Sequence, residues 1–160
     1  MIQKLIFVRH TEAEMIETGM NDAERKLTVI GKSEAKQTAK NLKTLLSEEK
    51  DIQFWSSPMV RAVATAKIIN KKLHAKKIET FPFIAEGDFD RLREAAQKSS
   101  ARCVVIIGHE PTLGEWAKRI SNCELPFKKG SAAAFTFSTE EFEKGNLLWF
   151  VQLNAIHSSK

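Results

Sequence analysis

Short apolar runs alternate along the chain with longer segments of helical periodicity. The run that ends at Val8 predicts a buried strand over residues 3–8, and "DIQFWSS" predicts a second strand that ends at Ser56. "RCVVIIG" at 102–108 is the strongest strand signal, and "KKIETF" is a weaker one. Two further strands are expected near the carboxyl terminus, in "AAAFTFS" and "NLLWFVQL".

Helical periodicity fills the segments between these strands. Between residues 29 and 49 apolar side chains recur every three or four positions, and Thr28 precedes them as a predicted N-cap. Ser57 and Pro58 predict the cap and the first position of a second helix that ends near Leu73. Two shorter helices are predicted to follow, one capped by Asp88 and one opened by Glu110 and Pro111.

The order of these elements predicts an α/β fold. Strands and helices alternate through residue 121, and two strands then follow in succession. Alternation favours a parallel sheet with helices on both faces, and the final pair favours an antiparallel edge. We therefore expect a three-layer sandwich around a mainly parallel central sheet, formed as a single domain over residues 1–160.

Composition narrows the class of protein further. Hydrophobic residues make up 42% of the 160 residues, which argues against disorder. The formal charge of +5 is spread thinly, and aromatic residues fall on apolar elements, so a nucleic-acid surface is not expected. The first apolar run is too short for a signal peptide or a membrane span. The chain has two cysteines and no CxxC pair, so we expect neither a zinc knuckle nor a disulfide framework. We expect the protein to be located in the cytoplasm.

Four polar residues stand at the carboxyl ends of predicted strands or just after them. Arg9 and His10 follow the first strand, Arg61 lies in the first turn of the helix after the second, and His109 follows the strand at 102–108. In an open α/β sheet these ends form one edge, where ligands usually bind. We therefore expect the two arginines and two histidines to converge.

This combination of side chains suits phosphoryl transfer. Arginine presents a planar fork of donors that matches phosphate oxygens, and helix N-termini add backbone donors. A neutral imidazole can attack phosphorus and carry the phosphoryl group covalently. A second histidine can bind an oxygen of the transition state.

Four motifs carry a family resemblance: "RHTEAE", "DAERKLTVIGKSEA", "SSPMVRAVATA" and "IIGHEPTL". They resemble, in order, the motifs of the histidine phosphatase superfamily, whose fold is phosphoglycerate-mutase-like. "GHEPTL" and "KKGSAAAFTF" favour the short bacterial phosphohistidine phosphatases. The resemblance implies His10 as nucleophile, a phosphate pocket completed by Arg9, Arg61 and His109, and hydrolysis without a metal or other cofactor.

Three neighbouring residues have open roles. Thr11 either donates to phosphate or satisfies the backbone of its own loop. Glu12 either orients the pocket through an arginine, which we favour, or is solvated. Larger members of the superfamily use a carboxylic acid to protonate the leaving group; Glu86 is the candidate here, whereas Asp88 reads as a helix cap.

The leading hypothesis is a phosphatase that acts on phosphohistidine in a phosphorylated protein, in signalling. One alternative is a small-molecule phosphomonoesterase with the same pocket, and another is a non-catalytic phosphate-binding regulatory module. "HTE" also fits part of a zinc deaminase motif, but the P-C-x-x-C partner is absent, as is a phosphate-binding G-x-x-x-x-G-K loop. His74 and His157 match no motif and are expected in solvent. The sequence leaves the oligomeric state open.

Substrate size follows from the spacing of the motifs. Between Arg61 and His109 the chain must supply the rest of a helix, a strand, another helix and a further strand, which leaves little for a lid. We therefore expect an open pocket that holds a phosphoryl group and leaves other substrate contacts to a protein surface.

Overall fold

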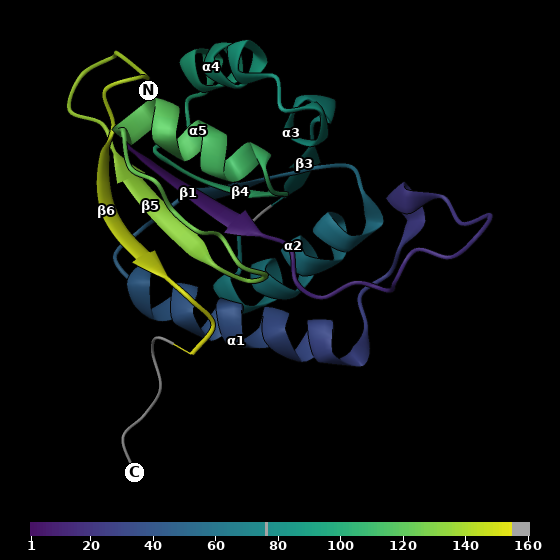
Figure 1. The fold of residues 1–160 in the computed structure, drawn as a ribbon. Coiled ribbons are helices and arrows are strands. Elements are labelled where there is room, and N and C mark those ends of the chain that lie inside the picture. The colour runs from purple at the N-terminus through teal and green to yellow at the C-terminus, as the bar shows by residue number, and fades with distance from the viewer. Residues whose placement is uncertain (76, 155–160) are drawn as a thin grey trace.

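The structure is a computed structural model that describes residues 1–75 and 77–154. A six-stranded sheet forms its centre, with the strand order β3-β2-β4-β1-β5-β6 (Figure 1). The strands are β1 (Lys4–Arg9), β2 (Ile52–Ser56), β3 (Ile78–Thr80), β4 (Cys103–Gly108), β5 (Ala132–Thr136) and β6 (Asn146–Val151).

The directions of the strands agree with the sequence prediction. β1 lies parallel to β4, so that Arg9 stands opposite Gly108 at the carboxyl ends of both strands. β2 is parallel to β4 and to β3, whereas β5 is antiparallel to β1 and to β6. The mainly parallel sheet with an antiparallel edge is therefore confirmed.

Helices cover both faces of the sheet, as the three-layer expectation requires (Figure 1). Side chains alternate along β1, so that Leu5 and Phe7 enter one core and Ile6 and Val8 enter the other. The Ile6 side packs against α1 (Val29–Leu45) and α2 (Val60–Leu73). The Leu5 side packs against α3 (Pro82–Glu86), α4 (Phe89–Lys98) and α5 (Thr112–Ser121).

Helix boundaries agree with the sequence in part. Thr28 caps α1, because its Oγ1 accepts a hydrogen bond of 2.9 Å from the amide of Gly31, and Asp88 caps α4 by accepting from the amide of Arg91. The prediction that Ser57 caps α2 is wrong, since Met59 takes the N-cap position and the helix begins one residue later. α3 was not predicted at all.

The segment between β1 and α1 projects beyond the rest of the molecule on the right of Figure 1. An isolated antiparallel bridge between Ala13 and Leu27 closes its base, and a short 3-10 helix, η1 (Asp22–Glu24), lies within it. We call residues 13–27 the arm. Its base lies at the carboxyl end of β1, where the predicted site is.

Candidate active site

His10 and His109 lie side by side at the carboxyl ends of the neighbouring strands β1 and β4. Their ring centroids are 5.1 Å apart, and both side chains are buried. The parallel pairing of β1 with β4 causes this approach, because it puts Arg9 opposite Gly108 and the next residue of each strand is a histidine. The predicted convergence of the two histidines is thus present in the structure.

A backbone hydrogen bond fixes the proton on His10. Its Nδ1 lies 2.8 Å from the carbonyl oxygen of Thr11. A carbonyl oxygen can only accept, so Nδ1 carries the hydrogen and donates it. In the neutral ring the other nitrogen, Nε2, then keeps a free lone pair.

Both histidines are held neutral. The pKa of His10 is lowered to about 4, chiefly by burial and also by the charges of Arg61 and Arg9, although the hydrogen bond to Thr11 works in the opposite direction. Burial likewise lowers the pKa of His109 to about 3, with the charges of His10 and Arg61 adding to the effect. At neutral pH the imidazole of His10 is therefore unprotonated.

Two arginines reach the same place from different elements. Arg61, in the first turn of α2, is 6% exposed and donates from Nη1 to the carbonyl oxygen of Asp22 over 2.8 Å. Arg9, at the end of β1, donates from Nη1 to the carbonyl oxygen of Phe127 over 2.9 Å. These main-chain contacts fix both guanidinium groups beside the histidines.

The pocket retains unused hydrogen-bonding capacity. Within the described residues, four buried side-chain nitrogen or oxygen atoms have no partner, and three of them are Arg9 Nε, Arg61 Nε and His109 Nδ1. Buried polar groups are normally satisfied, so such a cluster needs an explanation. A bound oxyanion would supply acceptors for the two guanidinium groups.

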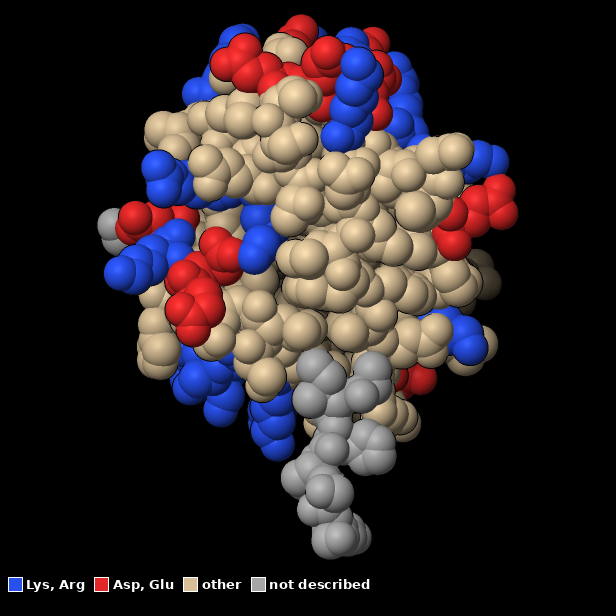
Figure 2. Space-filling view, turned by 90° about the vertical axis from the view of Figure 1, so that its left-hand side faces the viewer, with Lys and Arg blue, Asp and Glu red and all other residues tan. Residues whose placement is uncertain are grey.

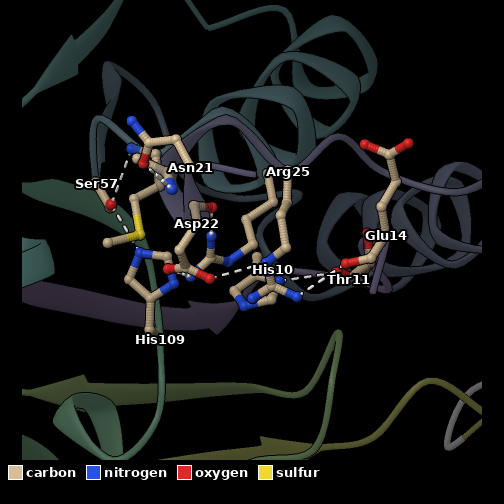
Figure 3. Close-up of polar contacts among 11 residues, drawn as sticks. His10, Thr11, Glu14, Asn21, Asp22, Arg25, Ser57 and His109 are labelled. Carbon is tan, nitrogen blue, oxygen red and sulfur yellow. Dashed lines mark hydrogen bonds and ion pairs between the residues drawn. The ribbon is translucent and has the colours of Figure 1, made fainter. Parts of the chain in front are cut away.

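Asp22 and Arg25 join the site from the arm, which the sequence analysis did not foresee (Figure 3). The carboxylate of Asp22 accepts from Arg61 Nη2 at 3.2 Å and from Arg25 Nε at 2.9 Å. Partial burial tends to raise the pKa of Asp22, but the charges of Arg61 and Arg25 lower it overall. Asp22 and Arg25 both belong to the "DAER" motif, so this motif was the sequence signal that could have identified them.

Ser57 supports His109. Its Oγ lies 2.7 Å from His109 Nε2, and the same oxygen accepts from the amide of Met59 at 3.2 Å. Figure 3 shows the two side chains facing each other, with the second ring nitrogen of His109 on the side of Asp22. Ser57 therefore orients a histidine in addition to its local backbone contact.

Two predicted neighbours have other tasks. The hydroxyl of Thr11 is fully buried and donates to the carbonyl of Gly31 over 2.7 Å, so its predicted role as a phosphate donor has no support in this geometry. The prediction that Glu12 orients an arginine is wrong, because its carboxylate accepts from the hydroxyl of Thr28 over 2.6 Å. Both residues attach the loop after β1 to the beginning of α1.

Glu86 is exposed at the end of α3, and no hydrogen bond or ion pair in the described part of the chain involves it. Its role as general acid stays a prediction. His74 is exposed, as expected, and His157 lies outside the described residues.

No group of three His, Cys, Asp or Glu residues within 1–75 and 77–154 is arranged to hold a metal ion. No helix in that part is long and apolar enough to cross a membrane.

Solved structures share this fold over nearly the whole chain. The protein histidine phosphatase SixA complexed with tungstate superposes with a TM-score of 0.82 at 22% identity, covering 94% of this chain and 97% of that one. A phosphoserine phosphatase mutant from Entamoeba histolytica, in complex with phosphoserine, gives 0.68 at 16% identity, covering 96% and 99%. A phosphoglycerate mutase from Plasmodium falciparum superposes with a TM-score of 0.63 at 19% identity, covering 98% and 93%, which confirms the phosphoglycerate-mutase-like fold.

Sequence comparison identifies the family. An uncharacterised protein of Picosynechococcus sp. (strain ATCC 27264 / PCC 7002 / PR-6) is 30% identical over 122 residues, which cover 74% of this chain and 73% of that protein. The family model of the histidine phosphatase superfamily (branch 1) matches residues 5–122. That match includes His10, Arg61 and His109. The chain therefore belongs to the histidine phosphatase superfamily.

Proposed function

We propose that this protein is a phosphohistidine phosphatase that acts on a phosphorylated protein through a covalent phosphohistidine on His10. One observation carries the proposal: His10 is neutral, its proton is fixed on Nδ1 so that Nε2 is free, and its ring lies beside a second neutral histidine and in the field of Arg61 and Arg9. The alternative of a non-catalytic phosphate-binding module would not require a nucleophile prepared in this way.

In the first step His10 Nε2 attacks phosphorus, and a new N–P bond forms as the P–N bond of the substrate breaks. The departing electron pair stays on the substrate imidazole, which leaves neutral if its other nitrogen carries a proton. The ring of His10 becomes positively charged, and the hydrogen bond from Nδ1 to Thr11 stabilises that charge. Arg9 and Arg61 stabilise the phosphoryl oxygens.

In the second step water attacks the phosphoryl group on His10. The new O–P bond replaces the P–Nε2 bond, the electron pair returns to Nε2, and a water proton passes to the departing phosphate or to solvent. His109 is held by Ser57 next to the ring of His10. We assign it the stabilisation of a phosphoryl oxygen in both steps.

The leaving group favours phosphohistidine over an alkyl phosphate. A protonated imidazole leaves without a positioned acid, whereas an alkoxide needs one. Glu86, the predicted acid, is exposed, and its carboxylate forms no hydrogen bond or ion pair within the described chain. The fold is also shared with a structure named as a protein histidine phosphatase. Both points support a phosphoprotein substrate.

A turnover assay tests the proposal. We expect a phosphohistidine-bearing protein to exceed sugar phosphates and phosphoglycerates in kcat/KM by at least about 10²-fold, or about 2.7 kcal/mol in transition-state stabilisation. Glu86→Gln should matter little for phosphohistidine. If a small phosphate ester is the better substrate and Glu86→Gln abolishes its turnover, the small-molecule phosphomonoesterase replaces this proposal.

The same assay examines the need for a metal. We expect hydrolysis to continue unchanged in the presence of a chelator, because guanidinium groups and neutral imidazoles supply the stabilisation of phosphate. Loss of activity on chelation, with recovery after addition of a divalent ion, would contradict this mechanism.

A further inference from the structure

Large apolar side chains reach solvent mainly on one side of the molecule. Seven such side chains in the described chain are exposed, and five of them lie on three short segments at the candidate active site. These five, which we call the apolar collar, are Met15, Ile16, Val29, Ile30 and Val60.

Hydrogen bonds connect two of these segments to the pocket, and the third is adjacent to Arg61 in the sequence. Met15 and Ile16 lie in the arm, directly after Glu14, whose carbonyl accepts from Arg25 Nη1 at 2.9 Å. Val29 and Ile30 form the first turn of α1, next to Gly31, whose carbonyl accepts from Thr11. Val60 is the first residue of α2 and precedes Arg61. The arm and the beginnings of α1 and α2 all lie on the right of Figure 1.

The exposure of these residues is large and is not explained by folding. Met15 is 85% exposed, Val29 is 84% exposed and Ile30 is 62% exposed, so burial gives them little stabilisation. Scattered apolar residues on a surface are ordinary, but a concentration around one pocket indicates a contact surface.

The first turns of α1 and α2 strengthen this interpretation. Acidic residues are favoured at that place in a helix because they interact with the positive end of its dipole. Neither first turn contains one, and the exposed positions hold Val29, Ile30 and Val60 instead. An acid there would repel a phosphorylated substrate, whereas an apolar side chain can contact the protein that carries the phosphoryl group.

We propose that the apolar collar is the docking surface for the phosphorylated protein, and that it contacts apolar side chains flanking the phosphohistidine. The inference rests on the proposed function. A phosphoryl group that reaches His10 brings its carrier over the arm and the starts of both helices, so the collar is continuous with the catalytic pocket. A small phosphate ester would leave most of the collar in water.

Matched phosphopeptides test the proposal from the substrate side. Two peptides of equal length carry one phosphohistidine each, flanked by leucines in one and by serines in the other. We expect the kcat/KM of the leucine peptide to exceed that of the serine peptide by at least about tenfold, equal to about 1.4 kcal/mol. This preference should arise from a lower KM for the leucine peptide. The variant M15S/I16S/V29S/I30S should lose this preference and hydrolyse free phosphohistidine at the normal rate.

Leu148→Ser is the matched control, because Leu148 is 50% exposed on β6, away from the pocket. It should keep the full preference for the leucine peptide. A wild-type protein without the preference, or a collar variant that retains it, would overturn the proposal. Equal loss of activity toward all substrates in the collar variant would also overturn it, since that result indicates damage to the pocket or the fold.

Binding separates this inference from the proposed function. Fluorescence anisotropy of labelled peptides on His10→Ala measures docking without hydrolysis, and we expect the leucine peptide to bind at least about tenfold tighter. If no phosphohistidine substrate is hydrolysed but this difference remains, the proposed function fails and the docking surface stands. Equal binding of both peptides, or self-association of the protein that the collar variant abolishes, would refute the docking surface.

Discussion

The two ends of the central sheet carry charge in different arrangements. At the amino end of β1, Lys4 forms an ion pair with Glu49, and Figure 2 shows positive and negative side chains next to each other on this side of the molecule. At the carboxyl end, Arg9 and Arg61 lie beside two neutral histidines, and both guanidinium groups keep a buried Nε without a partner in the described chain.

This difference separates structural charges from functional ones. The Lys4–Glu49 ion pair is only partly buried, and a pair that still contacts solvent contributes little to stability while its two members neutralise each other. Buried donors without acceptors cost stability and are retained where a ligand completes them. Substitutions at the carboxyl end should therefore change turnover, whereas a substitution at the amino end should change only stability.

Removal of the proposed nucleophile, His10, should have the largest effect. We expect His10→Ala to lower kcat by at least about 10⁴-fold, since no other described group takes over a covalent step. Circular dichroism should show an unchanged fold. Rapid quenching of the wild type during turnover should yield a phosphoryl group on His10, and its detection on a serine or cysteine would refute the mechanism.

Loss of one guanidinium should have the next largest effect. Arg61→Met should lower kcat/KM by about 10²–10³-fold, as expected for a donor that stabilises transition-state charge. Arg61→Lys should recover only part of the loss, because an ammonium group cannot form the two-pronged contact. Full activity of Arg61→Lys would mean that only charge matters at this position.

Acid should destabilise the carboxyl end specifically. An unfolded histidine has a pKa near 6.5, whereas the folded pKa is about 4 for His10 and about 3 for His109. Above pH 6.5 neither histidine makes the free energy of unfolding depend on pH. As the pH falls below 6.5, these histidines bind protons in the unfolded chain but not in the folded protein. Each histidine should lower the free energy of unfolding by up to about 1.4 kcal/mol per pH unit, down to pH 4 for His10.

Urea unfolding at pH 7 and pH 5 measures this dependence. His10→Ala and His109→Ala should each reduce the difference in the free energy of unfolding between pH 7 and pH 5. Titration of the imidazole signals by NMR should show both rings neutral at pH 5. A ring that protonates near pH 6.5 would show that burial does not control it.

The arm should matter less than the pocket itself. Asp22→Asn removes the negative charge between Arg25 and Arg61 but keeps an acceptor, so we expect a change in kcat/KM of about tenfold or less, comparable to one hydrogen bond. Steady-state kinetics will measure it. A change as large as that of Arg61→Met would place Asp22 in the chemistry.

The amino end should show the smallest effect. Lys4→Met breaks the ion pair with Glu49 and should lower the free energy of unfolding by about 1 kcal/mol or less. Its kcat/KM should equal that of the wild type. A substantial loss of turnover would remove the contrast between the two ends of the sheet.

The placement of the central histidines could be predicted from the sequence for a simple reason. Residues directly after parallel strands meet at one edge whatever the details of the loops, so His10 and His109 needed only a correct sheet. α3 was not predicted because a segment of five residues shows almost no periodicity. Pro82 at its first position and Gly87 after its last, with φ of 74°, were nevertheless signals of its two ends.

Roles that depend on the approach of two backbones were not predictable. The start of α1 lies so close to the loop after β1 that a Cβ on Gly31 would stand 1.9 Å from the carbonyl oxygen of Glu12. This contact brings Thr28 to the carboxylate of Glu12 and the carbonyl of Gly31 to Thr11. No spacing in the sequence indicates such a contact, nor the path that brings Asp22 to Arg61.

The position of β1 between β4 and β5 has a consequence for synthesis on the ribosome. His10 is made before both neighbours of its strand, which come from residues 103–136 and at typical elongation rates follow after on the order of ten seconds. During that interval the apolar stretch from Leu5 to Val8 lacks both of the strands that flank it in the folded sheet. The nascent chain therefore exposes this apolar segment until β4 and β5 are made, and His10 can meet His109 only after β4 has paired with β1.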